Sequence, residues 1–225
     1  MTCSDEWLKE NFDYRFLKKD LLEAALTHRS ADSRHNERLE FLGDSVLNTV
    51  VSDALYKAAP DAREGDLSRI RASLVNGKTL GQIAAEISLG RHLNLGSGEL
   101  KSGGFRRPSI LADALEAVIG AIYLDGGFDA AANSIRRFYG ERLKTLPRAE
   151  ELKDPKTRLQ EFLQGKGLPL PAYEVLHTQG EPHDQTFSVQ CSVESPRRTA
   201  NGVGKSRREA EQEAAGQLFA QLQDE

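Results

Sequence analysis

The sequence predicts a two-domain protein in which an all-α domain is followed by a smaller α-β-β-β-α domain. Apolar residues recur with helical spacing from about residue 7 to residue 146, and no convincing alternating strand interrupts them. Between residues 173 and 203 apolar and polar residues alternate, which is typical of half-buried strands. We therefore expect domains at 1–146 and 154–225, joined by a linker at 147–153.

The first domain is predicted as a series of helices separated by turn residues. Helical spacing occurs at 21–26, 39–55, 67–75, 80–87, 110–124 and 130–143. Breaks are expected at Pro60, 96–98, 102–104 and 126–127, where proline, glycine and serine gather. Ser109 is expected to cap the helix at 110–124, and Gly126–Gly127 is expected to end it.

The second domain is predicted to begin and end with a helix. A short helix at 157–164 precedes three strands, which lie at 173–177, 187–191 and 199–203. A final helix at 206–222 places four apolar residues on one face: Ala210, Ala214, Leu218 and Leu222. Cys191, in the middle strand, is expected to pack in the core of this domain.

Two acids stand inside the most apolar helical segment of the chain. The run Ile110–Leu124 contains thirteen uncharged residues, and its only charged residues are Asp113 and Glu116, one helical turn apart. A buried carboxylate without a cation or hydrogen-bond donors is costly, and two neighbouring carboxylates cannot both stay ionised in an apolar setting without a positive charge. The pair therefore favours a bound divalent metal ion.

A second acidic group lies upstream on another predicted helix. Glu37, Glu40 and Asp44 fall within an arc of about 60°, opposite the apolar side of that helix. A lone acidic stripe is ordinarily a solvated face. Here, however, Glu40 and Asp44 form a like-charge pair at i, i+4, which destabilises the helix where a lysine would have stabilised it. Combining Glu40, Asp44, Asp113 and Glu116 gives an oxygen-only site, which suits Mg²⁺, with Mn²⁺ as a substitute.

Charge and composition narrow the function classes. The net charge of −4 gives no support for nucleic-acid binding, but the segment 195–208 carries five basic residues and no acid. Two cysteines are too few for a disulfide framework or a structural zinc site. No leader or membrane span is recognisable, so we expect a cytoplasmic protein without a membrane partner or a small-molecule organic cofactor.

Four segments of the sequence resemble the ribonuclease III family, in its short bacterial form. They are NERLEFLGDSVL at 36–47, REGDLSRIRASLVN at 63–76, LKSGGFRRPSILADALEAVIGAIYLDGG at 100–127 and KDPKTRLQEFLQGKG at 153–167. The resemblance spans nearly the whole chain and implies an endonuclease domain at 1–146 and a double-stranded-RNA-binding domain at 154–225. It also implies a Mg²⁺-dependent homodimer whose subunits each cut one RNA strand, leaving 5′-phosphate and 3′-hydroxyl ends with short 3′ overhangs. Ribosomal RNA precursors are the expected substrates.

The resemblance assigns roles to several residues. It implies that the metal is held by Glu40, Asp44, Asp113 and Glu116, of which Asp44 and Glu116 are catalytic. It adds Glu37 and Glu64 as supporting acids. It also places Phe41 against the other subunit, although this residue is equally compatible with an ordinary core aromatic.

The chemistry of phosphodiester hydrolysis explains why acids and a metal suffice. A bound Mg²⁺ lowers the pKa of water and neutralises charge on the phosphoryl oxygens, so no protein nucleophile is needed. His28 is accordingly interpreted as a structural hydrogen-bonding residue rather than a catalytic base. Lys101, Arg106 and Arg107 are either a guide for the RNA backbone or a solvated basic loop.

Three features of the second domain suit the shallow minor groove of an RNA duplex. Gln160 and Gln164 can exchange hydrogen bonds with 2′-hydroxyl groups. A loop with Pro182 and His183 enters a neighbouring minor groove in the family. The last feature is a basic helix start with Lys205, Arg207 and Arg208, where side chains and free N–H groups can bind phosphate.

Each of these features is weak alone, because a basic helix start is usually a solvated face. Glu211 stands where many such domains carry a third basic residue, and Glu209 and Glu213 lie nearby. We therefore expect modest RNA affinity from this domain.

Two other functions compete with the nuclease. One is a non-catalytic regulator that binds double-stranded RNA, but such a protein gains nothing from four uncompensated acids. The other is a helical metal hydrolase of small phosphate compounds, which would leave the second domain without a role.

Overall fold

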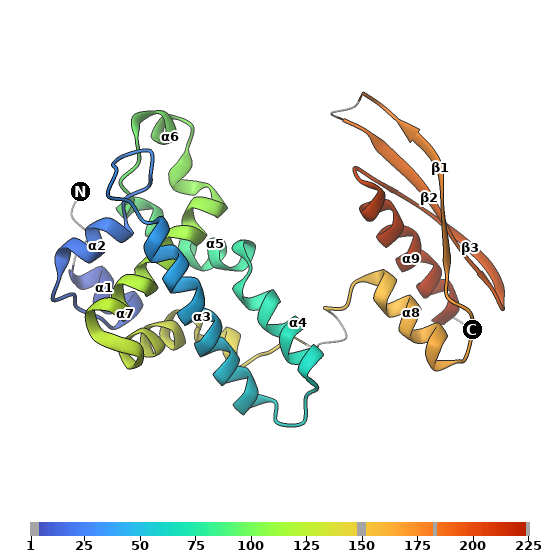
Figure 1. The fold of residues 1–225 in the computed structure, drawn as a ribbon, viewed down its shortest axis with the longest axis horizontal. Helices are drawn as coiled ribbons and strands as arrows, with labels where there is room; N and C mark the ends of the chain where they lie inside the picture. The colour runs from blue at the N-terminus through green and yellow to red at the C-terminus, as the bar shows by residue number, and fades with distance from the viewer. Residues whose placement is uncertain (1–4, 148–151, 182–183, 224–225) are drawn as a thin grey trace. The chain divides into compact units, whose positions relative to one another are not determined.

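The computed structural model describes residues 5–147, 152–181 and 184–223, and it confirms the predicted succession of a helical unit and an α-β-β-β-α unit (Figure 1). The chain divides into two compact units, residues 1–149 and 150–225. Of the expected linker at 147–153, residues 148–151 lie outside the described residues. Among the described residues, no helix combines the length and apolar character that crossing a bilayer requires.

In the described residues of the first unit, 5–147, the regular structure is helical, apart from one isolated bridge between Thr27 and Asn94. Its α-helices are α1 (Asp5–Phe12), α2 (Lys19–Ala25), α3 (Glu37–Ala58), α4 (Glu64–Val75), α5 (Gly77–Glu86), α6 (Ser97–Lys101) and α7 (Pro108–Tyr139). The described residues also form the 3₁₀ turns η1 (Leu89–His92) between α5 and α6, η2 (Gly104–Arg106) between α6 and α7, and η3 (Gly140–Leu143) after α7.

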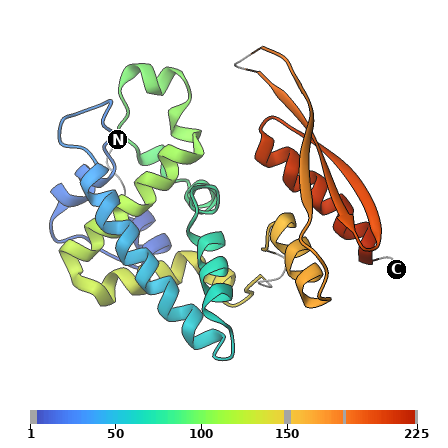
Figure 2. The same cartoon turned by 45° about the vertical axis from the view of Figure 1, so that its right-hand side comes forward.

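Helix α7 is the centre of this unit. Its first half is buried almost all round, and Leu115, Ile119 and Ile122 are fully enclosed. Helices α3, α5, α2 and α1 all pack against it, and Figures 1 and 2 both show α3 crossing beside it. Such a central helix must be apolar on every side, which explains why its sequence shows no polar stripe.

Helices α3 and α7 cross at two glycines. A Cβ atom on Gly43 would lie 1.7 Å from the backbone oxygen of Glu116, and one on Gly120 would lie 2.2 Å from the backbone oxygen of Leu39. The two backbones are therefore in direct contact, and no larger residue fits at either position. This crossing brings the acids of α3 beside those of α7.

One detail of the predicted α7 was wrong, and another was confirmed. The helix begins at Pro108 with Arg107 in the N-cap position, so Ser109 lies inside the first turn. Proline suits the first helical position because its missing N–H group would have no partner there. Gly127 has non-helical backbone angles (φ 82°, ψ −178°) and forms a kink that divides α7 into two helical segments, which confirms the expected break at Gly126–Gly127.

The second unit pairs a three-stranded antiparallel sheet with two helices. Its elements are α8 (Pro155–Gly165), β1 (Ala172–Gln179), β2 (Thr186–Glu194), β3 (Arg197–Gly204) and α9 (Arg207–Gln223), with strand order β1-β2-β3. Helix α9 packs on β2, β3 and α8. Leu159, Leu163, Cys191 and Leu218 belong to the shared core, which confirms the predicted burial of the cysteine. The predicted apolar face of α9 is likewise buried.

Candidate metal centre and nucleic-acid interface

Three carboxylates meet where α3 and α7 cross. Ligand oxygens of Glu40, Asp113 and Glu116 all lie within 4.8 Å of one another, and each side chain is partly buried. Glu40 comes from the first turn of α3, and the other two come from the start of α7. The fold thus joins residues that the sequence separates by more than seventy positions.

The acid triplet is only partly compensated by positive charge, because the pKa values of all three acids are raised. Burial raises the pKa of Glu116 to about 8, and the charges of three neighbouring acids, Asp44, Glu40 and Asp113, add to the effect. Burial also raises the pKa values of Glu40 and Asp113. Three clustered carboxylates without thiol or imidazole ligands fit a hard divalent cation, which would restore their ionised forms.

Asp44 lies at the exposed edge of the triplet and is not one of its members. Its carboxylate accepts a hydrogen bond of 2.7 Å from the side-chain amide of Asn48. The charge of Asp44 nevertheless raises the pKa of Glu116 and of Glu40, so it acts electrostatically on the same centre.

The two expected supporting acids lie in different surroundings. Glu37 begins α3, and its charge raises the pKa of Glu40 and of Asp113. Glu64 begins α4, accepts a 2.7 Å hydrogen bond from the Ser68 hydroxyl and lines a separate hollow of about 250 Å³ beside Tyr56. Glu37 is therefore part of the acidic neighbourhood, whereas Glu64 is not in the described triplet.

The fold brings two basic groups near Asp113, of which the sequence singled out His28 only as a hydrogen-bonding residue and did not single out Arg29. His28 and Arg29, in the loop between α2 and α3, each lower the pKa of Asp113 and partly offset its rise through burial. Nδ1 of His28 lies 2.8 Å from the hydroxyl of Ser30, as expected for a hydrogen-bonding residue. The sequence offered no signal for Arg29. It precedes Glu37 by eight residues, and such a separation across a loop follows no helical or strand repeat.

Phe41 is an exposed aromatic on α3. Its exposed fraction is 78%, so the alternative that it is a core aromatic of this chain is wrong. A large exposed apolar side chain on a rigid helix is suited to a contact with another molecule.

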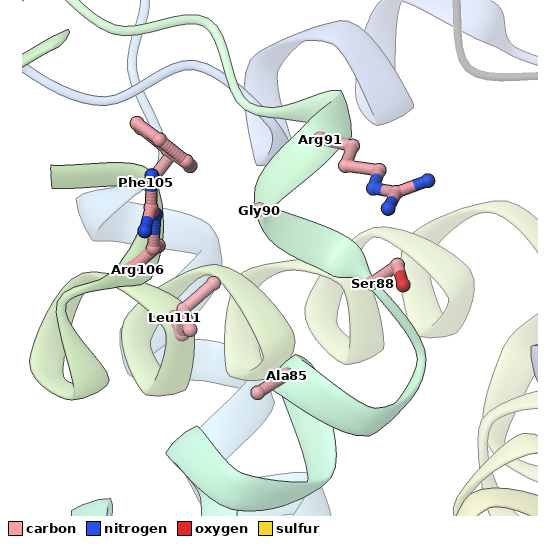
Figure 3. A pocket seen from close by; sticks show the side chains of 7 residues that line it. All are labelled: Ala85, Ser88, Gly90, Arg91, Phe105, Arg106 and Leu111. Atoms are coloured by element: carbon pink, nitrogen blue, oxygen red, sulfur yellow. The ribbon is translucent and has the colours of Figure 1, made fainter. Parts of the chain in front are cut away.

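The basic loop before α7 does not form one patch. Arg107 pairs with Glu99 at 2.6 Å, and the Arg106 guanidinium lies over the Phe105 ring, 4.8 Å from its centroid. A hollow of about 540 Å³ is lined by Ala85, Ser88, Gly90, Arg91, Phe105, Arg106 and Leu111 (Figure 3). In Figure 3 the Arg91 side chain points away from Phe105 and Arg106.

The predicted RNA-binding residues of α8 and α9 are exposed. Gln160 and Gln164 face solvent while their neighbours Leu159 and Leu163 are buried. A further exposed group comprises Lys205, Arg207 and Arg208. The expected loop residues Pro182 and His183 lie outside the described residues.

Acids already accompany the basic residues at the start of α9. Lys205 Nζ lies 2.7 Å from an oxygen of Asp184, and Arg207 Nε donates to Glu211 at 2.9 Å. Glu211 also pairs with Lys156 of α8 at 2.6 Å, so it ties the two helices together. The pairs of Lys205 with Asp184 and of Lys156 with Glu211 are tertiary contacts that the sequence analysis did not predict.

The backbone N–H groups at the start of α9 are less available to bind phosphate than predicted, because side chains of the same unit already accept some of their hydrogen bonds. The backbone N–H of Glu209 donates to the Ser206 hydroxyl at 3.2 Å. The Glu209 carboxylate in turn accepts the backbone N–H of Lys205 at 2.8 Å. Side chains of this unit therefore satisfy part of the helix start, and positive side chains carry more of any phosphate contact.

The chain combines a helical unit that carries a carboxylate centre with a following α-β-β-β-α unit, and this combination defines its class of two-domain protein. Residues 18–143 match the family described as Ribonuclease-III-like, and residues 155–222 match the double-stranded RNA binding motif. The chain belongs to the ribonuclease III family.

Individual relatives cover nearly the whole chain. Ribonuclease 3 of Alkalilimnicola ehrlichii is 56% identical over 100% of this chain and 98% of its own length. Ribonuclease 3 of Thiobacillus denitrificans is 55% identical over 97% of both chains. The solved nuclease domain of ribonuclease III from Campylobacter jejuni is 44% identical and has a TM-score of 0.60, covering 63% of this chain and 100% of its own.

Proposed function

We propose that this protein is a Mg²⁺-dependent endoribonuclease that hydrolyses phosphodiester bonds in double-stranded RNA. Its products carry 5′-phosphate and 3′-hydroxyl ends with short 3′ overhangs. The observation that carries the proposal is the acid triplet at the crossing of α3 and α7, in a chain that also matches a double-stranded RNA binding motif.

The proposed roles follow from burial and charge. Glu40, Asp44, Asp113 and Glu116 would hold the metal, which when bound would make a water more acidic and neutralise charge on the phosphate. The exposure of Asp44 supports a role for its carboxylate in accepting a proton from the attacking water. Glu116, whose pKa is raised to about 8 without a cation, gains most from a bound cation and is the second catalytic acid.

Acids outside the triplet have supporting roles in this proposal. Glu37 adds negative charge beside Glu40 and Asp113, which strengthens the attraction for a cation. Glu64, on α4, is proposed to act in the assembled enzyme, where a second subunit and the RNA change its surroundings.

The second unit is proposed to hold the duplex. Gln160 and Gln164 reach 2′-hydroxyl groups, and Pro182 and His183 enter a neighbouring minor groove. Phosphates are bound by Lys205, Arg207 and Arg208. Structured cellular RNAs, ribosomal precursors first among them, are the proposed substrates, which places the activity in the cytoplasm.

A homodimer is part of the proposal. The exposed Phe41 supports it, and the Campylobacter jejuni nuclease domain is described as having a region involved in dimer formation. Each subunit would then cut one strand. Sedimentation is expected to give twice the subunit mass of 24.9 kDa, and a single-subunit mass at working concentration would contradict this part.

A single set of incubations tests the activity. Purified protein is mixed with duplex RNA, single-stranded RNA or duplex DNA of the same sequence, with Mg²⁺ or with EDTA. Only duplex RNA with Mg²⁺ is expected to be cut. Binding without cleavage would instead support the non-catalytic regulator, and cutting in EDTA would exclude the metal mechanism.

A further inference from the structure

Arg29 lies at the edge of the acid centre. It belongs to the loop between α2 and α3, its side chain is 70% exposed, and its Nη1 lies 3.2 Å from Oε1 of Glu37. Glu37 acts on the pKa of Glu40 and of Asp113, and Arg29 itself acts on Asp113. The guanidinium is therefore a cation beside a centre that is otherwise acidic.

We propose that Arg29 binds a phosphate of the RNA strand next to the bond that is cut, and this inference rests on the proposed function. An RNA backbone that approaches several carboxylates meets repulsion, which an arginine at the entrance offsets. A guanidinium has five N–H donors in a planar fork that matches phosphate oxygens. One of its nitrogens contacts Glu37, and the exposed remainder can face a ligand.

The present partner of Arg29 is one that a phosphate can replace. The contact with Glu37 is long, and both side chains are about half exposed or more. Such surface pairs contribute little free energy, so exchange of the carboxylate for a phosphate is inexpensive. Arg34, on the same loop, instead pairs with Asp20 at 2.7 Å and provides a matched control.

Binding measured separately from cleavage tests this role. The full chain carries Glu116→Gln to block cutting, and affinity for a duplex RNA is measured in Mg²⁺ over a range of salt concentrations. Arg29→Gln is expected to weaken binding about 5- to 10-fold and to reduce the slope of log affinity against log salt by about one, as loss of one phosphate contact requires. Arg29→Lys is expected to keep the slope, and Arg34→Gln is expected to change neither quantity.

A Glu37→Gln variant separates phosphate binding from a merely structural role. If Arg29 binds phosphate, this variant frees the guanidinium, keeps the salt slope and tightens binding about two-fold. If Arg29 only positions Glu37, the variant reproduces the loss seen with Arg29→Gln, and the proposal is wrong. Unchanged affinity and slope in Arg29→Gln would also overturn it. A wild-type protein that binds but does not cut contradicts the proposed nuclease activity alone, because the binding results stand by themselves.

Discussion

The acid centre of the first unit and the basic surface at the start of α9 (Lys205, Arg207 and Arg208) differ in how nearby charges compensate them. Glu40, Asp113 and Glu116 are partly buried together and have raised pKa values, because protein cations offset them only weakly. Lys205 and Arg207 are exposed, and each already pairs with a carboxylate of its own unit.

The difference indicates which ligand each region needs. A bound divalent cation would let all the carboxylates of the acid centre ionise, so we expect its function to require a metal. Lys205 and Arg207 are paired within their own unit, so RNA phosphates must displace Asp184 or Glu211 to reach them, while Arg208 is exposed. Metal dependence should therefore be absolute, whereas RNA affinity should be modest and adjustable.

Removing one acid should produce the largest effect. Glu116→Gln is expected to lower the cleavage rate at least about 100-fold, since loss of a group that only supports a metal ligand already costs about 10–100-fold. RNA binding should remain, which gel-shift measurements in Mg²⁺ would check. Glu86→Gln, which removes a carboxylate paired with Arg142 away from the triplet, serves as the control. Cleavage at the wild-type rate by Glu116→Gln would refute the assignment.

Separating the two helices should act on fold and site together. Gly43→Ala places a methyl group against the backbone of α7 and is expected to lower the free energy of unfolding by about 3 kcal/mol or more, measured with urea. Cleavage should fall as well, because the acids move apart. Gly77→Ala meets nothing within 4 Å and should leave both quantities near those of the wild type. Equal stability of the two variants would show that the crossing tolerates a side chain.

The pH dependence of the free energy of unfolding tests how far protein cations compensate the charge of Glu116. In EDTA the folded chain keeps a proton on Glu116 up to about pH 8, whereas the unfolded chain releases it near the ordinary pKa of 4.5. The free energy of unfolding should therefore fall as the pH rises from about 5 to about 8, by at most about 1.4 kcal/mol per pH unit for one carboxyl group. Urea titrations at several pH values would show this, and Glu116→Gln should flatten the curve. A rise in stability over this interval would mean that protein cations already compensate the acid.

Releasing Lys205 from its ion pair with Asp184 should have the smallest effect of these changes. Asp184→Asn releases Lys205 and removes one negative charge, so RNA affinity should rise about two- to five-fold at moderate salt. Fluorescence anisotropy with a labelled duplex would measure it. Glu174→Gln, on β1, makes the same change in charge at another exposed position and should alter affinity less. Weaker binding by Asp184→Asn would show that Asp184 orients Lys205 for the RNA instead of masking it.

The sequence predicted features that depend on local spacing. Helical periodicity located α3 and the apolar α7, and the absence of cations among their acids pointed to Asp113 and Glu116. The same rules predicted the break at Gly127 but placed the N-cap of α7 at Ser109 instead of Arg107. The helix begins at Pro108 because the first helical position needs no N–H donor, and this preference outweighed the capping preference of serine.

Contacts between distant segments could not be predicted in this way. The approach of Gly43 to Gly120 joins two helices whose separate patterns do not specify a crossing point. Arg29 reaches Glu37 because of the path of a loop, and Lys156 reaches Glu211 because α8 packs on α9. Each is a tertiary contact, and neither residue type nor spacing within one element encodes it.

The glycine crossing also allows the stability of the first unit to change without changing the spacing between the acids. Because Gly43 and Gly120 let backbone touch backbone, helical geometry sets the spacing between the acids, with no intervening core side chain. Substitutions such as Ile119→Val elsewhere along α7 should then lower stability while the chemistry at the acids continues. The free energy of unfolding can accordingly be adjusted through the core of the first unit while the acid triplet keeps its geometry.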